Sequence, residues 1–307
     1  MIDINLLREN PASIKASQVA RGADESLVDL AASLAETKKT ALQQFETLRA
    51  KQNAHGKLVA QAPKEEKAAL VAQAQQLSAD VKKAEAEANQ ADQELMVVLH
   101  KIENVVLDGV PAGGEENFVV IKEVGKKPEF DFEAKDHVAL GELLDVIDIE
   151  RGAKIAGSRF YFLKGMGARL ELAMMQLALD QASEAGFTAL ITPTLVKPEI
   201  MQGTGFLGEH SAEVYYLPAD ELYLTGTSEV ALAGYHSDEI LDSLETPKRY
   251  AGWSTCYRRE AGSHGKDTRG ILRVHQFNKL EMFSYCKPED AEGEHEKLLA
   301  WQEQMLQ

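Results

Sequence analysis

Apolar residues recur at helical spacing through residues 26–103, a stretch that is nearly free of glycine. In its second half, apolar positions follow one another at alternating steps of four and three residues, which is the seam of a coiled coil. This seam comprises Leu70, Ala74, Leu77, Val81, Ala84, Ala88, Ala91, Leu95, Val98 and Ile102. The first half repeats the spacing from Leu27 to Leu48, interrupted by Lys38, whose aliphatic stem can lie along the seam. Two long helices are predicted.

A turn is predicted between the two helices. Gly56 and the run Gln61–Glu66 favour it, with Pro63 at the first position of the second helix. A short turn makes the helices antiparallel neighbours, and the alanines of the second helix allow close approach. We therefore expect a long two-helix hairpin that projects from a larger body.

After Ile102 the pattern changes. Glycines and a proline over 109–114 mark a linker, followed by a strand-like run, Phe118–Ile121. Short β runs then alternate with helices, so the chain is predicted to be α+β with a helical domain, 1–104, and a sheet-containing domain, 105–307.

One helix of the second domain is apolar on more than one face. It covers residues 170–185 and is expected to be buried. Gly186 ends this helix, and a short strand leads into Pro193. The pattern alone assigns this region to the core or to a subunit interface.

Composition excludes several classes of protein. The 307 residues are 44% hydrophobic and 27% charged, as in ordinary globular proteins. No apolar run approaches the roughly 18 to 20 residues that span a bilayer, and Met1–Asn5 opens no secretory signal. Cys256 and Cys286 are far apart, which favours a reducing cytoplasm and offers no metal cage.

Charge is distributed unevenly along the chain. The net charge of −16 discourages indiscriminate binding to polyanions, yet the predicted hairpin tip is locally +3. The tip charges are Arg49, Lys51, Lys57, Lys64 and Lys67 against Glu65 and Glu66. From this segment alone a solvated coiled coil or a dimerisation zipper is favoured, and a phosphate-binding tip is the alternative.

A second basic cluster lies within residues 250–285. Two strand-like runs flank a glycine-containing connection over 261–270, and the cluster carries +3. Its charges are Arg258, Arg259, Lys266, Arg269 and Arg273 against Glu260 and Asp267. Guanidinium groups bind phosphate oxygens in a planar, bidentate manner, which favours a polyphosphate. An exposed, salt-bridged hairpin is an equal alternative.

Strand periodicity places five residues of the second run on one face: Phe277, Lys279, Glu281, Phe283 and Tyr285. An aromatic ring beside a lysine and a carboxylate could stack on a base and hold a cationic group.

The run Leu224–Val230 is a further candidate. Thr227 or Ser228 could cap a helix that has Glu229 in its first turn. The functional alternative is a small polar pocket, with a carboxylate for an ammonium group and a hydroxyl for a second contact.

Together these stretches resemble the ordered motifs of class II aminoacyl-tRNA synthetases, and in detail the bacterial type of seryl-tRNA synthetase. The second motif of that family is matched almost letter for letter by Tyr257–Gly262, Asp267–Gly270, His275–Phe277 and Glu281. Phe187–Pro193 resembles the first motif, and Thr227–Ser228–Glu229 resembles the serine-binding triplet. The opening Asn5–Arg8, the helical arm, Gly157–Phe160 and Gly167–Glu171 match as well.

The resemblance implies a cytoplasmic, homodimeric ligase of protein biosynthesis. It implies ATP-dependent activation of L-serine, with Mg²⁺, and transfer to tRNA(Ser), and also to tRNA(Sec). The arm would lie along the long variable arm of the tRNA, and the first motif would form the dimer interface. No membrane contact and no resident metal site are implied.

The resemblance also assigns residues. Arg258, Glu260 and Arg269 would be catalytic. The ATP site would comprise Arg258, Arg259, Glu260, Val274 and Phe277, with Phe277 stacked on adenine. The L-serine site would comprise Thr227, Ser228, Glu229 and Glu281.

One element of the family pattern is missing. A third, glycine-rich motif ending in an ATP-clamping arginine is expected well beyond the second, but after Glu281 the chain has only Gly293 and no arginine. We expect a fragment of a longer ligase, because every other motif position carries the expected residue type. The alternatives are a non-catalytic synthetase-like protein that binds tRNA or another protein through its arm, and a ligase that loads serine or a similar amino acid onto another acceptor.

Overall fold

The computed structural model describes residues 2–241, 243–261, 265 and 269–307. The chain divides into two compact units, Met1–Lys122 and Glu123–Gln307. Six residues of the predicted connection lie outside the described residues: Gly262, Ser263, His264, Lys266, Asp267 and Thr268. In the part that is described, no helix is sufficiently long and apolar to cross a membrane.

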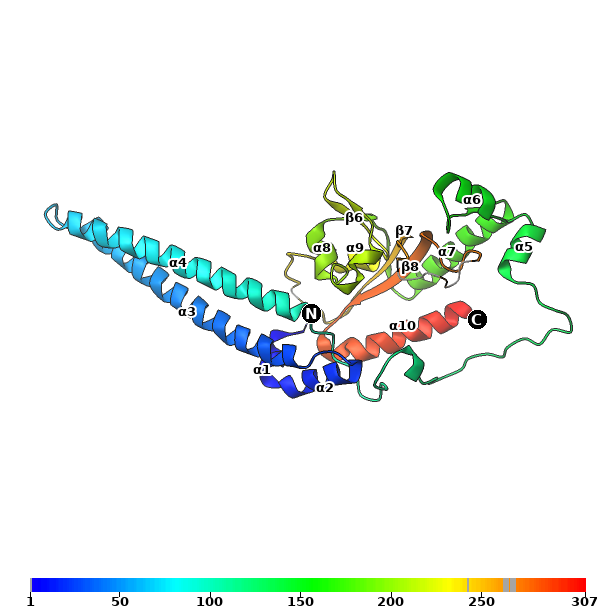
Figure 1. Cartoon of the computed structure of the whole chain (residues 1–307), viewed down its shortest axis with the longest axis horizontal. Coiled ribbons are helices and arrows are strands. Elements are labelled where there is room, and N and C mark those ends of the chain that lie inside the picture. The colour runs from blue at the N-terminus through cyan, green and yellow to red at the C-terminus, as the bar shows by residue number, and fades with distance from the viewer. Residues whose placement is uncertain (1, 242, 262–264, 266–268) are drawn as a thin grey trace. The chain divides into compact units, whose positions relative to one another are not determined.

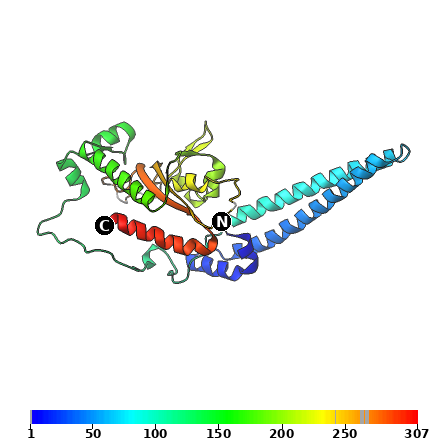
Figure 2. The ribbon, with the colours of Figure 1, turned by 180° about the vertical axis from the view of Figure 1, so that it is seen from behind.

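The first unit contains the predicted hairpin. Helix α3 (Ser26–Gln61) and helix α4 (Lys67–Leu99) run side by side for their whole length (Figures 1 and 2). The predicted seam is confirmed, because the α4 positions nearest the base are buried: Val81, Ala84, Ala88, Ala91, Leu95 and Val98, followed by Ile102. Lys38 is half-buried, and its Nζ lies 2.5 Å from Asp92 Oδ1 on the other helix.

The turn lies within the predicted run Gln61–Glu66, but the expected parts of Gly56 and Pro63 are wrong. Gly56 is inside α3, and Pro63 precedes α4 by four residues instead of opening it. A single glycine costs a helix only about 1 kcal/mol, which the packing of a long hairpin offsets. Proline disfavours the helical conformation of the residue before it, and Ala62 is accordingly extended, so α3 ends at Gln61.

Two short helices close the base of the hairpin. Helix α1 (Ile4–Glu9) and helix α2 (Pro11–Arg21) bury Leu7 and Ile14 against the base of α3 and α4. The Gln18 side chain donates to the Glu103 carbonyl at 3.0 Å and accepts from the Glu103 N–H at 3.2 Å. This pair fixes the chain where it leaves the hairpin.

The predicted strand Phe118–Ile121 is wrong. The only regular element near it is a short 3₁₀ turn, η1 (Glu115–Asn117), and the side chains that follow are exposed, Ile121 by 96%. A strand requires a partner for its backbone groups, and no described strand pairs with this run.

The second unit is organised around a three-stranded sheet. Strand β7 (Lys248–Tyr257) lies between β3 (Thr188–Ile191), which is parallel to it, and β8 (Gln276–Tyr285), which is antiparallel. Helices α7 (Met166–Glu184) and α10 (Ala291–Leu306) cover one face of this sheet. Their shared core comprises Ala182, Phe187, Ala251, Leu280, Met282 and Trp301.

Smaller elements surround this sheet. The second sheet has the order β4 (Leu195–Val196), β6 (Leu222–Leu224), β5 (Tyr216–Leu217), and the third pairs β1 (Ile147–Asp148) with β2 (Phe162–Leu163). The remaining helices are α5 (His137–Leu143), α6 (Ile149–Ala156), α8 (Pro198–Gly203) and α9 (Glu229–Ala233), with 3₁₀ turns η2 (Glu209–Glu213) and η3 (Pro288–Asp290). Helix α9 packs on the sheet face opposite to α7: Gly252 of β7 has no side chain, and a Cβ there would lie 2.9 Å from Leu232.

The expectation that the helix over 170–185 is buried is wrong. Gly186 ends α7 as predicted, with φ +87°, but only Ala182 of the helix is buried. Leu170, Met174 and Leu177 follow one another on one helical face and are 54–59% exposed. The rest of the chain therefore leaves this apolar face of α7 uncovered. Of the two interpretations made from the sequence, core or subunit interface, the subunit interface is the one that remains.

A buried ion pair joins the sheet to α10. The Arg249 guanidinium donates two 2.8 Å hydrogen bonds to Glu294, whose side chain is 4% exposed. These bonds, with others from Lys297 and Ser284, lower the pKa of Glu294 from 4.5 to about 2. The sequence did not indicate this pair, which joins β7 to the C-terminal helix.

We expect Glu294→Gln to lower the free energy of unfolding at pH 7 by about 3 kcal/mol. This is the free energy that corresponds to the lowering of the Glu294 pKa from 4.5 to about 2. The folded-state pKa is depressed, so this stabilisation is complete above pH 4.5 and is lost as the pH falls towards 2. Urea unfolding at pH 7 and at pH 3 measures it, with the exposed Glu292→Gln as control. A deficit of equal size at both pH values would contradict the assignment.

Candidate active site

The site lies on the sheet face opposite to α7. The chain between β7 and β8 covers residues 258–275, so the predicted hairpin is confirmed but its connection is longer than 261–270. The alternation along β8 is confirmed as well. Leu280 and Met282 face α7, whereas Phe277 and Glu281 contact groups on the other face.

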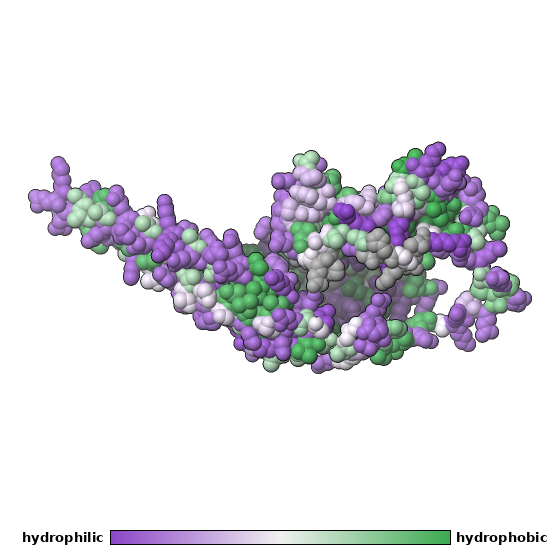
Figure 3. All heavy atoms as spheres, in the orientation of Figure 1, coloured by the Kyte–Doolittle hydropathy of each residue, from purple (hydrophilic) through white to green (hydrophobic). Residues whose placement is uncertain are grey.

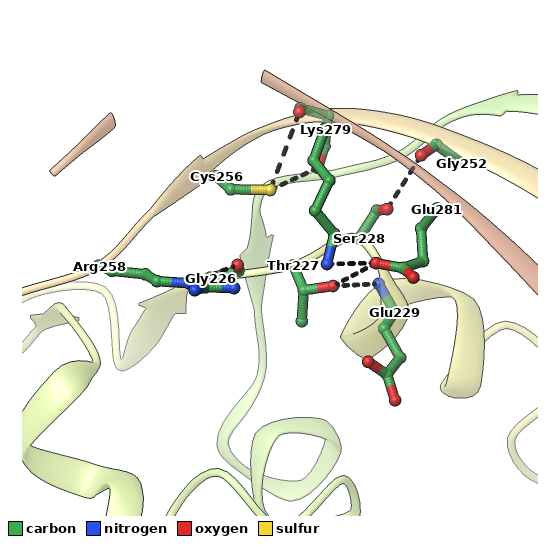
Figure 4. Close-up of polar contacts among 10 residues, drawn as sticks. Gly226, Thr227, Ser228, Glu229, Gly252, Cys256, Arg258, Lys279 and Glu281 are labelled. Atoms are coloured by element: carbon green, nitrogen blue, oxygen red, sulfur yellow. Dashed lines mark hydrogen bonds and ion pairs between the residues drawn. The ribbon is translucent and has the colours of Figure 1, made fainter. Parts of the chain in front are cut away.

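Thr227, Lys279 and Glu281 form a polar cluster (Figure 4). The Thr227 hydroxyl donates to Glu281 Oε2 at 3.0 Å, and the Lys279 ammonium is ion-paired with the same oxygen. Thr227 is buried, whereas Glu281 keeps 26% of its side chain accessible. The cluster can hold an ammonium group where the lysine now sits, because Glu281 supplies the charge and Thr227 a second polar contact.

The other two residues of the triplet are placed differently. The Ser228 side chain is fully buried and donates to the Gly252 carbonyl at 2.9 Å, which ties α9 to β7. Glu229 donates its backbone N–H to Thr227 Oγ1 at 3.2 Å, whereas the N-cap of α9 is Ser228, whose side chain makes no capping bond. The carboxylate of Glu229 is exposed and points away from Glu281 (Figure 4).

Arg258 lies between this cluster and an aromatic ring. Its Nε donates to the Gly226 carbonyl at 3.2 Å, and its guanidinium carbon lies 5.1 Å from the centre of the Phe277 ring. The side chain is exposed, so its remaining donors can reach a ligand. The backbone is fixed by a 3.0 Å bond from the Arg258 N–H to the His275 carbonyl.

Glu260 is held by Arg273 of the predicted basic cluster, whereas Arg259 is held by two residues that the sequence did not indicate. Glu260 accepts from Arg273 at 2.8 Å and is 9% exposed. Arg259 stacks over Tyr215 at 5.8 Å and donates its N–H to the Glu213 carbonyl at 2.9 Å. Glu213 and Tyr215 precede the arginines by more than forty residues, so no local pattern could have identified them.

The last two predicted residues lie on the return limb of the connection, which we define as residues 269–275. Val274 is buried. Arg269 donates to Asp136 Oδ2 at 2.6 Å, which brings it to the start of α5. No group of three or more acidic, histidine or cysteine side chains suited to a metal ion occurs among the described residues.

The chain matches two protein families. Residues 216–307 match the family described as tRNA synthetase class II core domain (G, H, P, S and T), and residues 1–106 match the Seryl-tRNA synthetase N-terminal domain. The sheet, the arginine-bearing hairpin and the arm thus define a class II aminoacyl-tRNA synthetase.

Individual relatives identify the family within this class. The chain is 65% identical over 307 residues to a serine–tRNA ligase of Leifsonia xyli subsp. xyli, and covers 73% of its length. It is 61% identical to that of Clavibacter sepedonicus, and covers 72% of it. The chain belongs to the seryl-tRNA synthetase family.

Solved structures agree. A seryl-tRNA synthetase from Pyrococcus horikoshii, complexed with ATP, superposes with a TM-score of 0.84 at 33% identity, over 98% of this chain and 73% of that one. A cytoplasmic serine–tRNA ligase from Naegleria fowleri, in complex with AMP, superposes with a TM-score of 0.79 at 29% identity. The superposition covers 98% of this chain and 74% of that one.

Proposed function

We propose that the chain activates L-serine with ATP and transfers the seryl group to tRNA(Ser). The observation that carries the proposal is one strand face that presents two different subsites. Phe277 and Glu281 are four residues apart on β8, or about 13 Å at strand rise, which is the scale of an aminoacyl-adenylate. Serine would occupy the Glu281 end, and adenine would stack at the Phe277 end.

With serine at the Glu281 end and adenine at the Phe277 end, the serine carboxylate would face the α-phosphate of ATP. A serine carboxylate oxygen attacks the α-phosphorus of ATP, a new P–O bond forms, and the bond to the bridging oxygen breaks to release pyrophosphate. Arg258 lies between the two ends and would stabilise the charge on the α-phosphate and the serine carboxylate. A ribose hydroxyl at the tRNA terminus then attacks the seryl carbonyl, and AMP leaves.

The other assigned residues would support this arrangement. Glu260 and Arg259 would lie against the nucleotide, Val274 would contact it through its backbone, and Arg269 would reach the phosphates. Ser228 would hold the serine loop to β7 rather than touch serine, given its bond to Gly252. Glu229 would turn towards serine only when the site is filled. Mg²⁺ would enter as the ATP complex.

We expect Thr227→Val to raise the KM for serine about 10- to 100-fold and to leave the KM for ATP unchanged. The change is nearly isosteric, and a hydrogen bond to a charged group contributes about 1.5–3 kcal/mol. Serine-dependent ATP–pyrophosphate exchange measures it. Thr225→Val is the matched control, because the Thr225 hydroxyl is buried without a partner among the described residues. Equal effects of the two variants would contradict the serine site.

These assays use two forms of the protein. One is the 307-residue chain, and the other, called the extended chain below, adds the segment that follows the matched region in the Leifsonia xyli relative. The extension would supply the third motif that the family resemblance requires.

The arm would bind the tRNA. Its tip carries the basic cluster predicted from the sequence, and the face of the arm seen in Figure 3 is mainly hydrophilic. Recognition of the long variable arm by shape and phosphate contact suits such a surface, and tRNA(Sec) would be bound in the same way. The protein would carry out this reaction in the cytoplasm.

The chain would act as a homodimer through α7 and β3. The apolar face of α7 and the 88% exposed Ile191 form the surface that a second copy would cover. We expect Leu177→Glu to yield monomers at micromolar concentration with unchanged circular dichroism, because a buried unpaired charge is costly. Sedimentation measures the mass, with Glu184→Gln on the same helix as control. A variant dimer as stable as wild type would contradict this interface.

A further inference from the structure

The return limb rests on the first residues of α5. Besides the Arg269–Asp136 bond, the backbone N–H of Ile271 donates to His137 Nε2 at 3.0 Å. Between these two contacts lies Gly270, whose φ of +86° favours glycine. Three consecutive residues of the limb therefore meet Asp136, the N-cap of α5, and the first two residues of that helix, His137 and Val138.

The contact is closely fitted. A Cβ added to Gly270 would lie 1.9 Å from His137 Nε2 and 2.8 Å from Val138 Cγ2, so any side chain at this position would displace the His137 ring. His137 accepts a hydrogen bond through Nε2, which requires that nitrogen to be unprotonated. The limb backbone is thus anchored by one imidazole.

The Asp136 carboxylate has two tasks at once. One oxygen caps α5 by accepting from the Ala139 N–H at 2.8 Å, and the other accepts from Arg269 at 2.6 Å. The first bond, followed by the charge of Arg269, lowers the pKa of Asp136, so the group is anionic at neutral pH. The ion pair is accessible, with 68% of the Arg269 side chain and 45% of that of Asp136 exposed.

We propose that His137 positions the return limb for ATP, and that Asp136 holds Arg269 until the triphosphate takes it over. The proposal rests on the proposed function, in which Arg269 reaches the phosphates. An exposed ion pair contributes little, so a polyphosphate with more charge and several acceptor oxygens displaces the single carboxylate. The two residues then act in opposite senses: His137 favours ATP binding and Asp136 competes with it.

Three variants of the extended chain separate these roles. Asp136→Asn keeps the helix cap but removes the charge that competes for Arg269. His137→Ala removes the anchor, whereas His137→Gln returns an acceptor near the position of Nε2. The readouts are the Kd for ATP·Mg²⁺ by calorimetry and the KM for serine in pyrophosphate exchange.

We expect Asp136→Asn to tighten ATP binding about two- to five-fold, the range that an exposed ion pair allows. His137→Ala should weaken it about ten-fold, as for one lost anchoring bond, and His137→Gln should recover most of the loss. The KM for serine should stay within about two-fold throughout.

Weaker ATP binding in Asp136→Asn, or failure of His137→Gln to restore affinity, would overturn the proposal, because a purely structural α5 predicts both. If the extended chain binds ATP but shows no serine-dependent exchange, the proposed function is refuted. The ATP affinities of the Asp136 and His137 variants still decide the roles of these two residues. An extended chain that binds no ATP would overturn both.

Discussion

Replacing Arg258 by alanine is expected to abolish serine-dependent ATP–pyrophosphate exchange, with a loss of about 10³-fold or more in kcat/KM. The guanidinium lies between the Thr227–Glu281 cluster and the Phe277 ring, where the pentavalent phosphorus of the transition state would form. Removal of one preorganised donor to developing charge costs about 10²- to 10³-fold, and the proposed role of Arg258 in binding the serine carboxylate would add to the loss.

Two further variants sharpen this result. Arg258→Lys keeps the charge but loses the planar pair of donors, and should retain activity between alanine and wild type. Arg151→Ala removes an exposed, ion-paired arginine from α6 and should leave exchange unchanged. Exchange at near wild-type rate in Arg258→Ala would refute the assigned role.

Shortening the arm is expected to separate the two half-reactions. Deletion of residues 42–86, bridged by a short glycine–serine turn, removes the distal hairpin but keeps the buried base of α3 and α4. Serine activation should stay within about two-fold, while kcat/KM for tRNA aminoacylation should fall about 100-fold or more, as expected for several lost phosphate contacts. Pyrophosphate exchange measures serine activation, and a separate tRNA charging assay measures aminoacylation.

The basic tip provides a finer version of the same test. Lys64→Gln with Lys67→Gln should weaken tRNA binding and flatten its dependence on salt, since each phosphate contact releases counterions. Gln substitution of Lys82 and Lys83, farther along α4, is the control. Unchanged charging by the shortened protein would show that the arm does not bind the tRNA.

The helical arm was predictable from sequence because its core is local. Each seam residue from Val81 to Ile102 is buried, since a heptad repeat defines its own partner within the hairpin. The turn lies within the predicted run Gln61–Glu66, but Gly56 is not part of it, because a glycine tolerates a helix once both sides pack. Phe118–Ile121 has β-forming residues, but propensity does not supply a strand with a partner.

The site was predictable in part. The spacing along one strand predicted that Phe277, Lys279 and Glu281 share a face. The family resemblance predicted that Thr227 and Arg258 belong to the same site. Glu213, Asp136 and His137 carry no motif, and contact the connection from distant parts of the chain. Such contacts depend on tertiary packing, which a single sequence does not encode in its local pattern.

The most direct measurement is ATP–pyrophosphate exchange by the extended chain, with each standard amino acid in turn. Exchange should depend on serine, with alanine discriminated strongly, because an analogue without the hydroxyl leaves buried polar groups unpaired. The 307-residue chain without the third motif should be inactive. Silence of the extended chain with every amino acid, while it still binds tRNA, would contradict serine activation and favour a non-catalytic tRNA-binding protein.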